Sequence, residues 1–166
     1  MKLCLKEIIK RLSLLEQQKT KILADERQNC STTYGTGEEK RSIDYSFSAT
    51  RSGIESLDSK IRQLKHKLHL ANATVQVPEF EMTLGECIIY MAQLNNEKYI
   101  LETMRFKEEK SRITTHGGAV DWTEINYSKT ECNDLLNNIN EKIMRLQMVI
   151  DRTNLTTEVE VEINLD

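Results

Sequence analysis

Two loops with the same chemistry occur in this chain of 166 residues. Each contains Thr-Thr, then Tyr or His, then Gly, and each is followed by a segment that ends in Tyr-Ser. Together they supply hydroxyl groups, cations and flat rings, which are the side chains that bind phosphate oxygens and stack on bases. The candidate ligand-binding residues are Thr32, Thr33, Tyr34, Lys40, Arg41 and Tyr45 in the first loop and Arg112, Thr114, Thr115, His116, Trp122 and Tyr127 in the second. The alternative is that the Thr and Gly residues only form turns and the Tyr residues anchor a ribbon.

Catalytic and metal-binding patterns are weak throughout the chain. His66 and His69 lie among basic side chains that would repel a metal ion, and a basic helix end suits the helix dipole. No motif links His116 to a nucleophile, and Gly117-Gly118 lacks the sequence of a phosphate-binding loop. The four cysteines lack zinc-ligand spacing and are expected to be reduced, mostly buried thiols. We therefore expect no catalytic residue, no metal and no cofactor.

The two loops belong to a tandem duplication. A shift of 82 residues aligns 31–74 with 113–156 without a gap, and a shift of 79 residues aligns the opening segment with the segment that begins near Leu84. Such internal repeats are sought first, because they decide the architecture. The sequence predicts a single domain of two repeats, 1–79 and 80–157, followed by a strand-like tail, 158–166.

Each repeat has the pattern of a helix, a loop, a short strand and a second helix. Apolar residues recur three or four positions apart along four segments, as in helices that pack at a shallow angle. These residues are Leu5, Ile8, Leu12, Leu15 and Ile22; Ile54, Leu57, Ile61, Leu64 and Leu68; Leu84, Ile88, Met91, Leu94 and Leu101; and Leu136, Ile139, Ile143, Leu146 and Ile150. Capping boxes are expected at Thr83 with Glu86 and at Ser128 with Glu131.

The ends of these segments carry further signals. We expect Asn72 and Asn154, which lie where the apolar stripes end, to terminate the helices, because Asn tolerates the left-handed conformation. Alternating apolar residues predict short strands at Ile43–Phe47, more loosely at Trp122–Tyr127, and in the tail. The predicted fold is mainly α: duplicated helical hairpins form an antiparallel, coiled-coil-like four-helix bundle. A small β-ribbon comes from the inter-helix loops, and the tail joins it or another subunit.

Composition and charge limit the function. The formal net charge is −3, whereas a general nucleic-acid binder has a basic excess. No apolar stretch approaches the roughly 20 residues of a transmembrane helix, and the N-terminus has no secretory-signal pattern, so we expect a cytoplasmic protein. Residues 1–79 hold 14 basic and 10 acidic side chains, and residues 80–166 hold 9 and 16. Opposite charges on the two halves favour contact between subunits, or neutralise each other within one chain.

Short motifs along most of the chain resemble one known family. They are Met1-Lys2-Leu3 before a helix, Ala71-Asn72-Ala73-Thr74 after one, Thr83-Leu84-Gly85-Glu86 at the next helix start, and the ending Asp151–Thr157. They resemble the DIP1984 family, whose members are also called septicolysin-like. The chain departs from it at Leu155, where the family usually has Trp. The resemblance implies a bacterial or phage helical protein without an assigned catalytic residue.

These patterns predict a non-catalytic, homo-oligomeric binding protein. Its expected ligand is small, anionic and nucleotide-like, sequestered at loop–strand ends or between subunits. One alternative is an interaction scaffold that binds another protein through its helices or its tail. A second alternative is the membrane-active function that the cytolysin name implies, although no basic amphipathic helix with aromatic anchors supports it.

Overall fold

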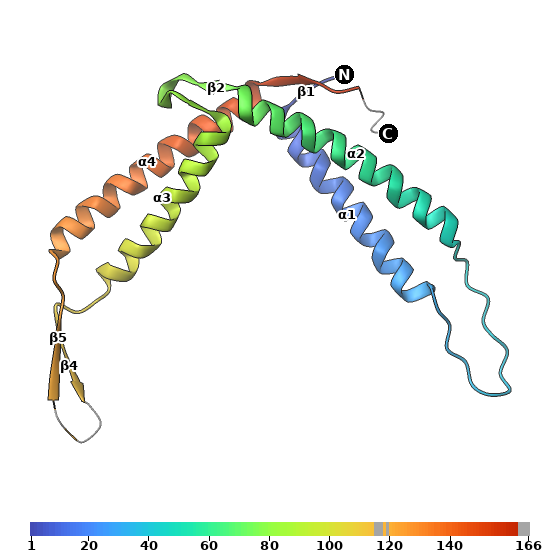
Figure 1. The fold of residues 1–166 in the computed structure, drawn as a ribbon, viewed down its shortest axis with the longest axis horizontal. Coiled ribbons are helices and arrows are strands. Elements are labelled where there is room, and N and C mark those ends of the chain that lie inside the picture. Colours follow the sequence, from blue (N-terminus) through green and yellow to red (C-terminus); the bar gives the residue numbers. More distant parts are fainter. Residues whose placement is uncertain (115–117, 119, 163–166) are drawn as a thin grey trace. The chain divides into compact units, whose positions relative to one another are not determined.

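The computed structural model describes residues 1–114, 118 and 120–162, and it is mainly helical. The helices of this part of the chain are α1 (Leu5–Asn29), α2 (Phe47–Thr74), α3 (Leu84–Arg105) and α4 (Lys129–Thr156). Short antiparallel strand pairs accompany them (Figure 1). The predicted fold class, helical hairpins with small β-ribbons, is confirmed.

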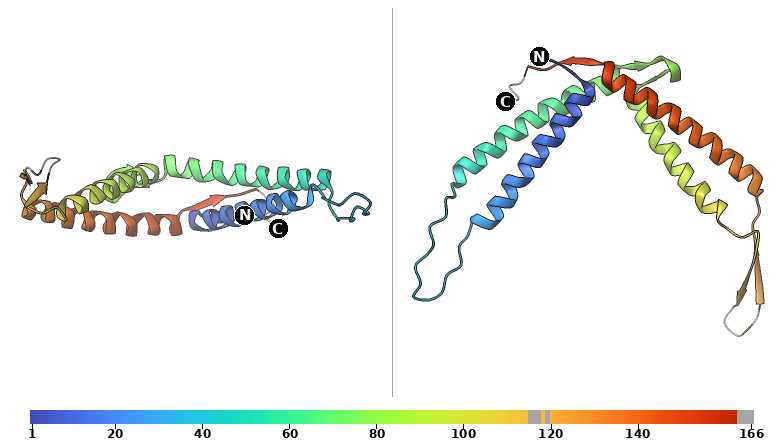
Figure 2. Two further views of the ribbon diagram at one scale, coloured as in Figure 1. Left: turned by 90° about the horizontal axis from the view of Figure 1, so that it is seen from below. Right: turned by 180° about the vertical axis from the view of Figure 1, so that it is seen from behind.

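The first helical hairpin consists of α1 and α2, which run side by side in opposite directions (Figure 2). Leu5, Ile8, Leu12 and Leu15 of α1 are buried against the α2 face that carries Ile54, Ile61 and Leu64, as the apolar spacing predicted. Ion pairs reinforce this contact at its margins, with Lys19 Nζ 2.6 Å from Asp58 Oδ1 and Lys65 Nζ 2.7 Å from Glu16 Oε1. Such exposed pairs contribute roughly 0–1 kcal/mol each, so the apolar stripe provides most of the stability.

The second hairpin consists of α3 and α4. Buried residues of α3 include Leu94 and Leu101, and the Cys132 thiol of α4 donates to the Leu101 carbonyl oxygen at 3.6 Å. The stripe predicted for α4 is buried at Leu136, Ile139, Leu146 and Ile150. The prediction for Ile88 is wrong: its side chain is 43% exposed, and the neighbouring Cys87 is buried instead. Leu84, Leu94 and Leu101 are buried as predicted, so the apolar stripe takes the position three residues after Leu84 and not the position four residues after it.

Both repeats begin with a capping box. The backbone N–H of Thr83 donates to Glu86 Oε2 at 2.7 Å, and Thr83 Oγ1 accepts from the Glu86 N–H at 3.2 Å. Cys4 and Glu7 form the same arrangement at the start of α1, with 2.8 Å from the Cys4 nitrogen to Glu7 Oε2. The backbone hydrogen bond is the main cause that lowers the pKa of each of these carboxyls. The equivalence of the two boxes corresponds to the 79-residue shift of the sequence repeat.

The second helix of each repeat has a serine N-cap. Ser46 Oγ accepts from the Ala49 N–H at 3.4 Å, and Ser128 Oγ accepts from the Glu131 N–H at 3.3 Å, as expected for Ser128. The prediction that Asn72 and Asn154 terminate the helices is wrong. Helices α2 and α4 each continue for two residues beyond these asparagines, to Thr74 and Thr156.

Strand pairs follow the repeat as well. β2 (Gln76–Val77) pairs with β3 (Met82–Thr83), and the short 3-10 helix at Pro78–Phe80 connects them. Correspondingly, β6 (Glu158–Glu160) pairs with β1 (Lys2–Cys4), so the tail binds the N-terminus of its own chain. The Met1 amino group donates to the Val161 carbonyl oxygen at 2.8 Å. The β1–β6 pair therefore joins the two ends of the chain, and the β2–β3 pair is its counterpart in the connection between α2 and α3.

The two inter-helix loops differ. In the second, β4 (Lys110–Thr114) and β5 (Val120–Glu124) form an antiparallel hairpin. In the first, residues 31–46 contain no strand, so the strand predicted at Ile43–Phe47 is wrong, and its pairing with the second loop is wrong too. Ser46 caps α2 and makes Phe47 the first helical residue, which ends the extended segment before it can pair.

The chain divides into two compact units, Met1–Val75 with Asn154–Asp166, and Gln76–Thr153. The first unit contains the α1–α2 hairpin and the paired termini, and the second contains α3, most of α4 and the β4–β5 hairpin. Within the described residues, no helix has both the length and the apolar character that a membrane span requires.

Candidate functional site

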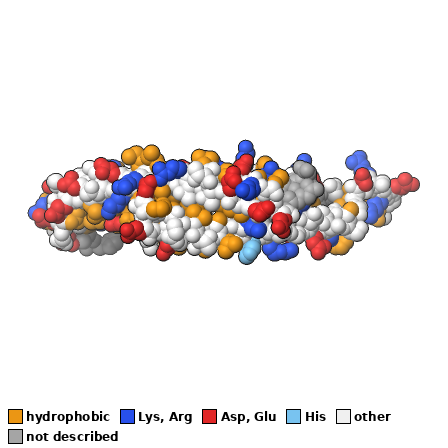
Figure 3. Space-filling model, turned by 90° about the horizontal axis from the view of Figure 1, so that it is seen from above, with side chains coloured by type: hydrophobic (Ala, Val, Ile, Leu, Met, Phe, Trp, Pro, Cys, Tyr) orange, Lys and Arg blue, Asp and Glu red, His pale blue; other side chains and the backbone are white. Residues whose placement is uncertain are grey.

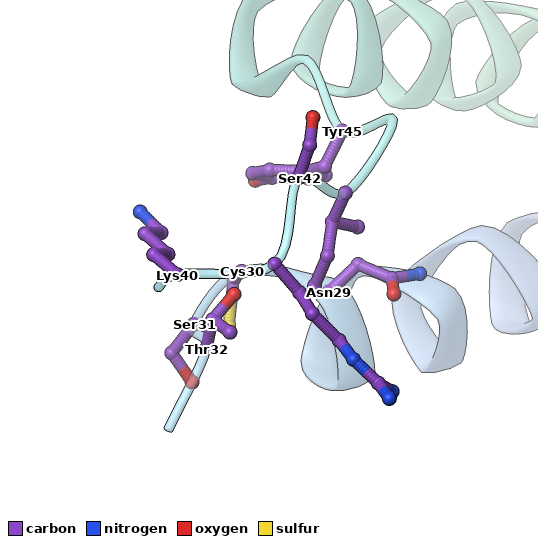
Figure 4. A pocket seen from close by; sticks show the side chains of 9 residues that line it. Asn29, Cys30, Ser31, Thr32, Lys40, Ser42 and Tyr45 are labelled. Atoms are coloured by element: carbon purple, nitrogen blue, oxygen red, sulfur yellow. The ribbon is translucent and has the colours of Figure 1, made fainter. Parts of the chain in front are cut away.

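A pocket of ≈ 360 Å³ lies where α1 ends and the first inter-helix loop returns toward α2 (Figure 4). Its lining residues come from two short segments at the two ends of the loop. They are Asn29, Cys30, Ser31 and Thr32 from the outgoing segment and Lys40, Arg41, Ser42, Ile43 and Tyr45 from the returning segment. We call this cavity the loop pocket.

The loop pocket is lined by two cations and by no carboxylate. Neither Lys40 nor Arg41 forms an ion pair with any residue that the structure describes. Glu39 directly precedes Lys40 in the sequence but does not line the pocket, and the Glu38 carboxylate accepts from the Gly35 backbone N–H at 2.9 Å. The polar lining also includes the Asn29 amide and the hydroxyl groups of Ser31, Thr32 and Ser42, whereas the Tyr45 hydroxyl already donates to Glu26. Cations beside hydroxyl donors favour a bound anion.

Hydrogen bonds to α1 and α2 hold the returning segment in place. The Tyr45 hydroxyl donates to Glu26 Oε1 at 3.0 Å, and Glu26 Oε2 forms an ion pair with Arg51. Directly after Tyr45, the Ser46 cap begins α2. At the far end of the loop, the Glu38 N–H donates to the Gly35 carbonyl oxygen at 3.0 Å, which forms a turn. The pocket residues Lys40 and Arg41 lie between these two fixed points.

A second cavity of ≈ 550 Å³ adjoins the loop pocket. Cys30 and Tyr45 line both, which makes them the shared wall. The remaining lining residues are Glu26, Arg27, Phe47 and Arg51. The Phe47 side chain is 65% exposed, and the Arg51 guanidinium carbon lies 5.7 Å from the centre of its ring. We call this cavity the Phe47 cavity.

The structure brings together only part of the predicted first-loop site. Thr32, Lys40, Arg41 and Tyr45 line the loop pocket. Thr33 and Tyr34 do not line it, although the sequence grouped them with the other four, and Tyr34 is 54% exposed. Sequence reasoning missed Ser31, Ser42 and Cys30 in this pocket and Phe47 beside it. The sequence could have pointed to these residues, because they lie close to the end of the first predicted helix or the start of the second.

The second-loop candidates have a different arrangement, on the β4–β5 hairpin. Arg112 and Trp122 are directly opposite each other across the two strands, and Thr114 is opposite Val120. The Trp122 side chain is 62% exposed, and the Lys110 ammonium lies 5.5 Å from its ring centre. Thr115 and His116 lie outside the described residues.

Tyr127 anchors the end of the second inter-helix loop to α3. Its hydroxyl donates to the Met104 carbonyl oxygen at 2.6 Å, near the end of α3. Tyr45, at the equivalent place in the first repeat, likewise reaches back to α1 through Glu26. Both tyrosines therefore fix a loop to the preceding helix, which is the structural alternative considered for them, and Tyr45 lines the loop pocket as well.

Metal-binding chemistry has little support in the described residues, where no group of three or more His, Cys, Asp or Glu side chains could hold an ion. His66 and His69 are both exposed on α2. Acidic and basic side chains alternate over the face shown in Figure 3, and no broad basic patch appears there. The loop pocket has the residues for a local anion site.

Comparison with known proteins gives the fold and no activity. No family model matches the chain, and no curated protein matches it by sequence. Its structure is similar to the crystal structure of a conserved Corynebacterium diphtheriae protein of unknown function. The TM-score is 0.71 at 13% sequence identity, and the match covers 96% of this chain and 100% of the other. At this low identity, the similarity establishes a shared fold across nearly the whole chain.

Proposed function

We propose that this protein binds a small phosphate-bearing anion in the loop pocket. The observation that carries the proposal is a lining of two cations without an ion-pair partner in the described chain, together with the hydroxyl groups of Ser31, Thr32 and Ser42 and no carboxylate. Binding of this kind needs no catalytic group, so the protein acts by sequestering its ligand.

The charges of the lining residues favour an anion, whereas the C-terminal end of α1 and the carboxylates of Glu39 and Asp44, which neighbour lining residues in the sequence, oppose one. α1 ends at Asn29, and the C-terminal end of a helix carries roughly half a negative charge. Lys40 and Arg41 carry two full positive charges in the same pocket, which outweighs this. Both side chains are exposed, so solvent and salt screen them. A hydrogen bond to a charged group contributes about 1.5–3 kcal/mol, and this exposure places the expected gain at the lower end of that range.

The wider proposal is that the chain forms a homo-oligomer. The uneven distribution of charge between residues 1–79 and 80–166 supports it, because opposite surfaces attract between copies. The tail was a second argument for self-assembly, as a strand added to another subunit, and the scaffold alternative also used the tail to bind another protein. Residues Glu158–Glu160 already pair with Lys2–Cys4 of the same chain, which leaves that strand less available. The fold shared with the corynebacterial protein of unknown function is in keeping with the DIP1984 resemblance, and neither supplies a binding site.

Calorimetric titration with pyrophosphate tests the anion site. At low ionic strength, wild-type protein should bind, and Arg41→Ala should weaken binding about tenfold or more, since 1.4 kcal/mol corresponds to a factor of ten. Arg62→Ala is the matched control, because Arg62 is an exposed cation of α2 outside the pocket. Equal binding by Arg41→Ala and wild type would contradict the proposal. A chain that ends at Thr157 lacks β6 and the rest of the tail. If the loop pocket is the binding site, this shortened chain should still bind pyrophosphate, whereas the scaffold alternative expects the loss of the tail to matter more.

A further inference from the structure

The Phe47 cavity complements the loop pocket in chemistry. The loop pocket carries cations and hydroxyl groups, whereas the Phe47 cavity offers an aromatic ring, and its carboxylate and one guanidinium are already paired with each other. Because Cys30 and Tyr45 line both, a ligand that extends past this wall contacts both cavities.

The Phe47 ring is exposed and lies beside a cation at the start of α2. It belongs to the first residue of α2, where Ser46 fixes the helix start. Arg51, one turn later, places its guanidinium 5.7 Å from the ring centre, and Glu26 of α1 pairs with that guanidinium. The Phe47 side chain is 65% exposed, so it gains little from burial, and the Arg51 guanidinium beside its ring is itself held by Glu26. A ring of this kind is a stacking platform, on which any flat base can lie.

We infer that the two cavities form one elongated site for a nucleotide-type ligand, with its phosphates in the loop pocket and its base stacked on Phe47. This inference rests on the proposed function, because the loop pocket must first hold the phosphates. It assigns the ring contact to Phe47, a residue outside the loop candidates identified from the sequence.

The same contacts determine how selective the site is. One oxygen of the Glu26 carboxylate accepts from Tyr45 and the other pairs with Arg51. The cavity therefore presents no unengaged carboxylate to the amino groups of a base. Stacking, which depends on ring area, decides the preference, so purine nucleotides bind more tightly than pyrimidine nucleotides and the two purines bind alike.

Calorimetric titration with ADP and with pyrophosphate tests this inference. Wild-type protein should bind ADP about tenfold or more tightly than pyrophosphate, in line with stacking on one aromatic side chain. Phe47→Ala should bind pyrophosphate as wild type does and lose the advantage of ADP. Phe47→Leu should behave in the same way, because it keeps the apolar bulk and removes the aromatic face.

Phe106→Ala is the matched control. Phe106 is 77% exposed at the end of α3, and Arg105 lies 4.9 Å from its ring centre, so it reproduces the Phe47–Arg51 pair elsewhere in the chain. This variant should keep the full advantage of ADP. If wild type binds both ligands equally, or if Phe47→Leu keeps the advantage, the inference is overturned while the anion site stands. If wild type does not bind pyrophosphate, the proposed function itself fails.

Discussion

Gly53 provides a clean test of the helical structure around the site. It lies inside α2, and a Cβ atom built there would meet no atom within 4 Å, so an alanine fits without a clash. Glycine is less favourable than alanine in a helix interior by about 0.8–1.0 kcal/mol. Since the added methyl group gains no packing partner, Gly53→Ala should raise the free energy of unfolding by about 0.5–1 kcal/mol. For a chain of this size the melting temperature rises by about 2–4 °C per kcal/mol.

Urea unfolding followed by far-ultraviolet circular dichroism measures this change. Gly37→Ala is the contrasting variant, because Gly37 has a backbone φ of 92° in the first loop, and alanine there should destabilise the fold. Gly53 also lines a groove between α1 and α2 that lies outside the loop pocket, so Gly53→Ala should leave pyrophosphate binding unchanged. A loss of stability in Gly53→Ala would refute the assignment of this position to an open helix surface.

Two further predictions follow from groups whose pKa is shifted. The hydrogen bond from the Thr83 backbone lowers the pKa of Glu86 below its ordinary value of 4.5. The ionised carboxylate therefore stabilises the fold above that value, and this stabilisation is lost as the pH falls through the lower pKa of the folded state. The difference in urea midpoint between wild type and Glu86→Gln should therefore shrink as the pH falls from neutral. Glu141→Gln, at an exposed position of α4, is the matched control for the loss of a surface carboxylate. In the second prediction, iodoacetamide should modify Cys30 quickly and Cys87 only on unfolding, because burial raises the pKa of the Cys87 thiol. Rapid modification of Cys87 in the native protein, located by peptide mass spectrometry, would contradict this prediction.

The helical part of the fold was predictable because its signals are local and repeated. The apolar spacing, the Thr83–Glu86 box and the 79- and 82-residue shifts predict the helices and the places where they begin. The prediction that α2 ends at Asn72 was wrong, because the helix continues through this residue to Thr74. Asn tolerates a left-handed residue but does not require one, and the observed left-handed residue comes later, at Glu81.

The strands were harder to predict, because a strand needs a partner that local sequence does not identify. Residues Ile43–Phe47 alternate in polarity as β5 does, yet only β5 has a neighbouring segment in register, β4. The site shows the same limit. Lys40 and Arg41 were identified by type, whereas the contribution of Phe47 depends on its place beside the loop pocket.

The location of the anion site is the central claim, and amide chemical shifts test it most directly. A titration of isotopically labelled protein with pyrophosphate should shift the backbone amide signals of residues 30–32 and 40–43. Signals from β4 and β5 should stay in place and serve as the internal control, because no residue of these strands lines the loop pocket. Saturable shifts confined to the first group are the predicted result. Shifts confined to the β4–β5 hairpin, or no saturable shift at all, would contradict the account.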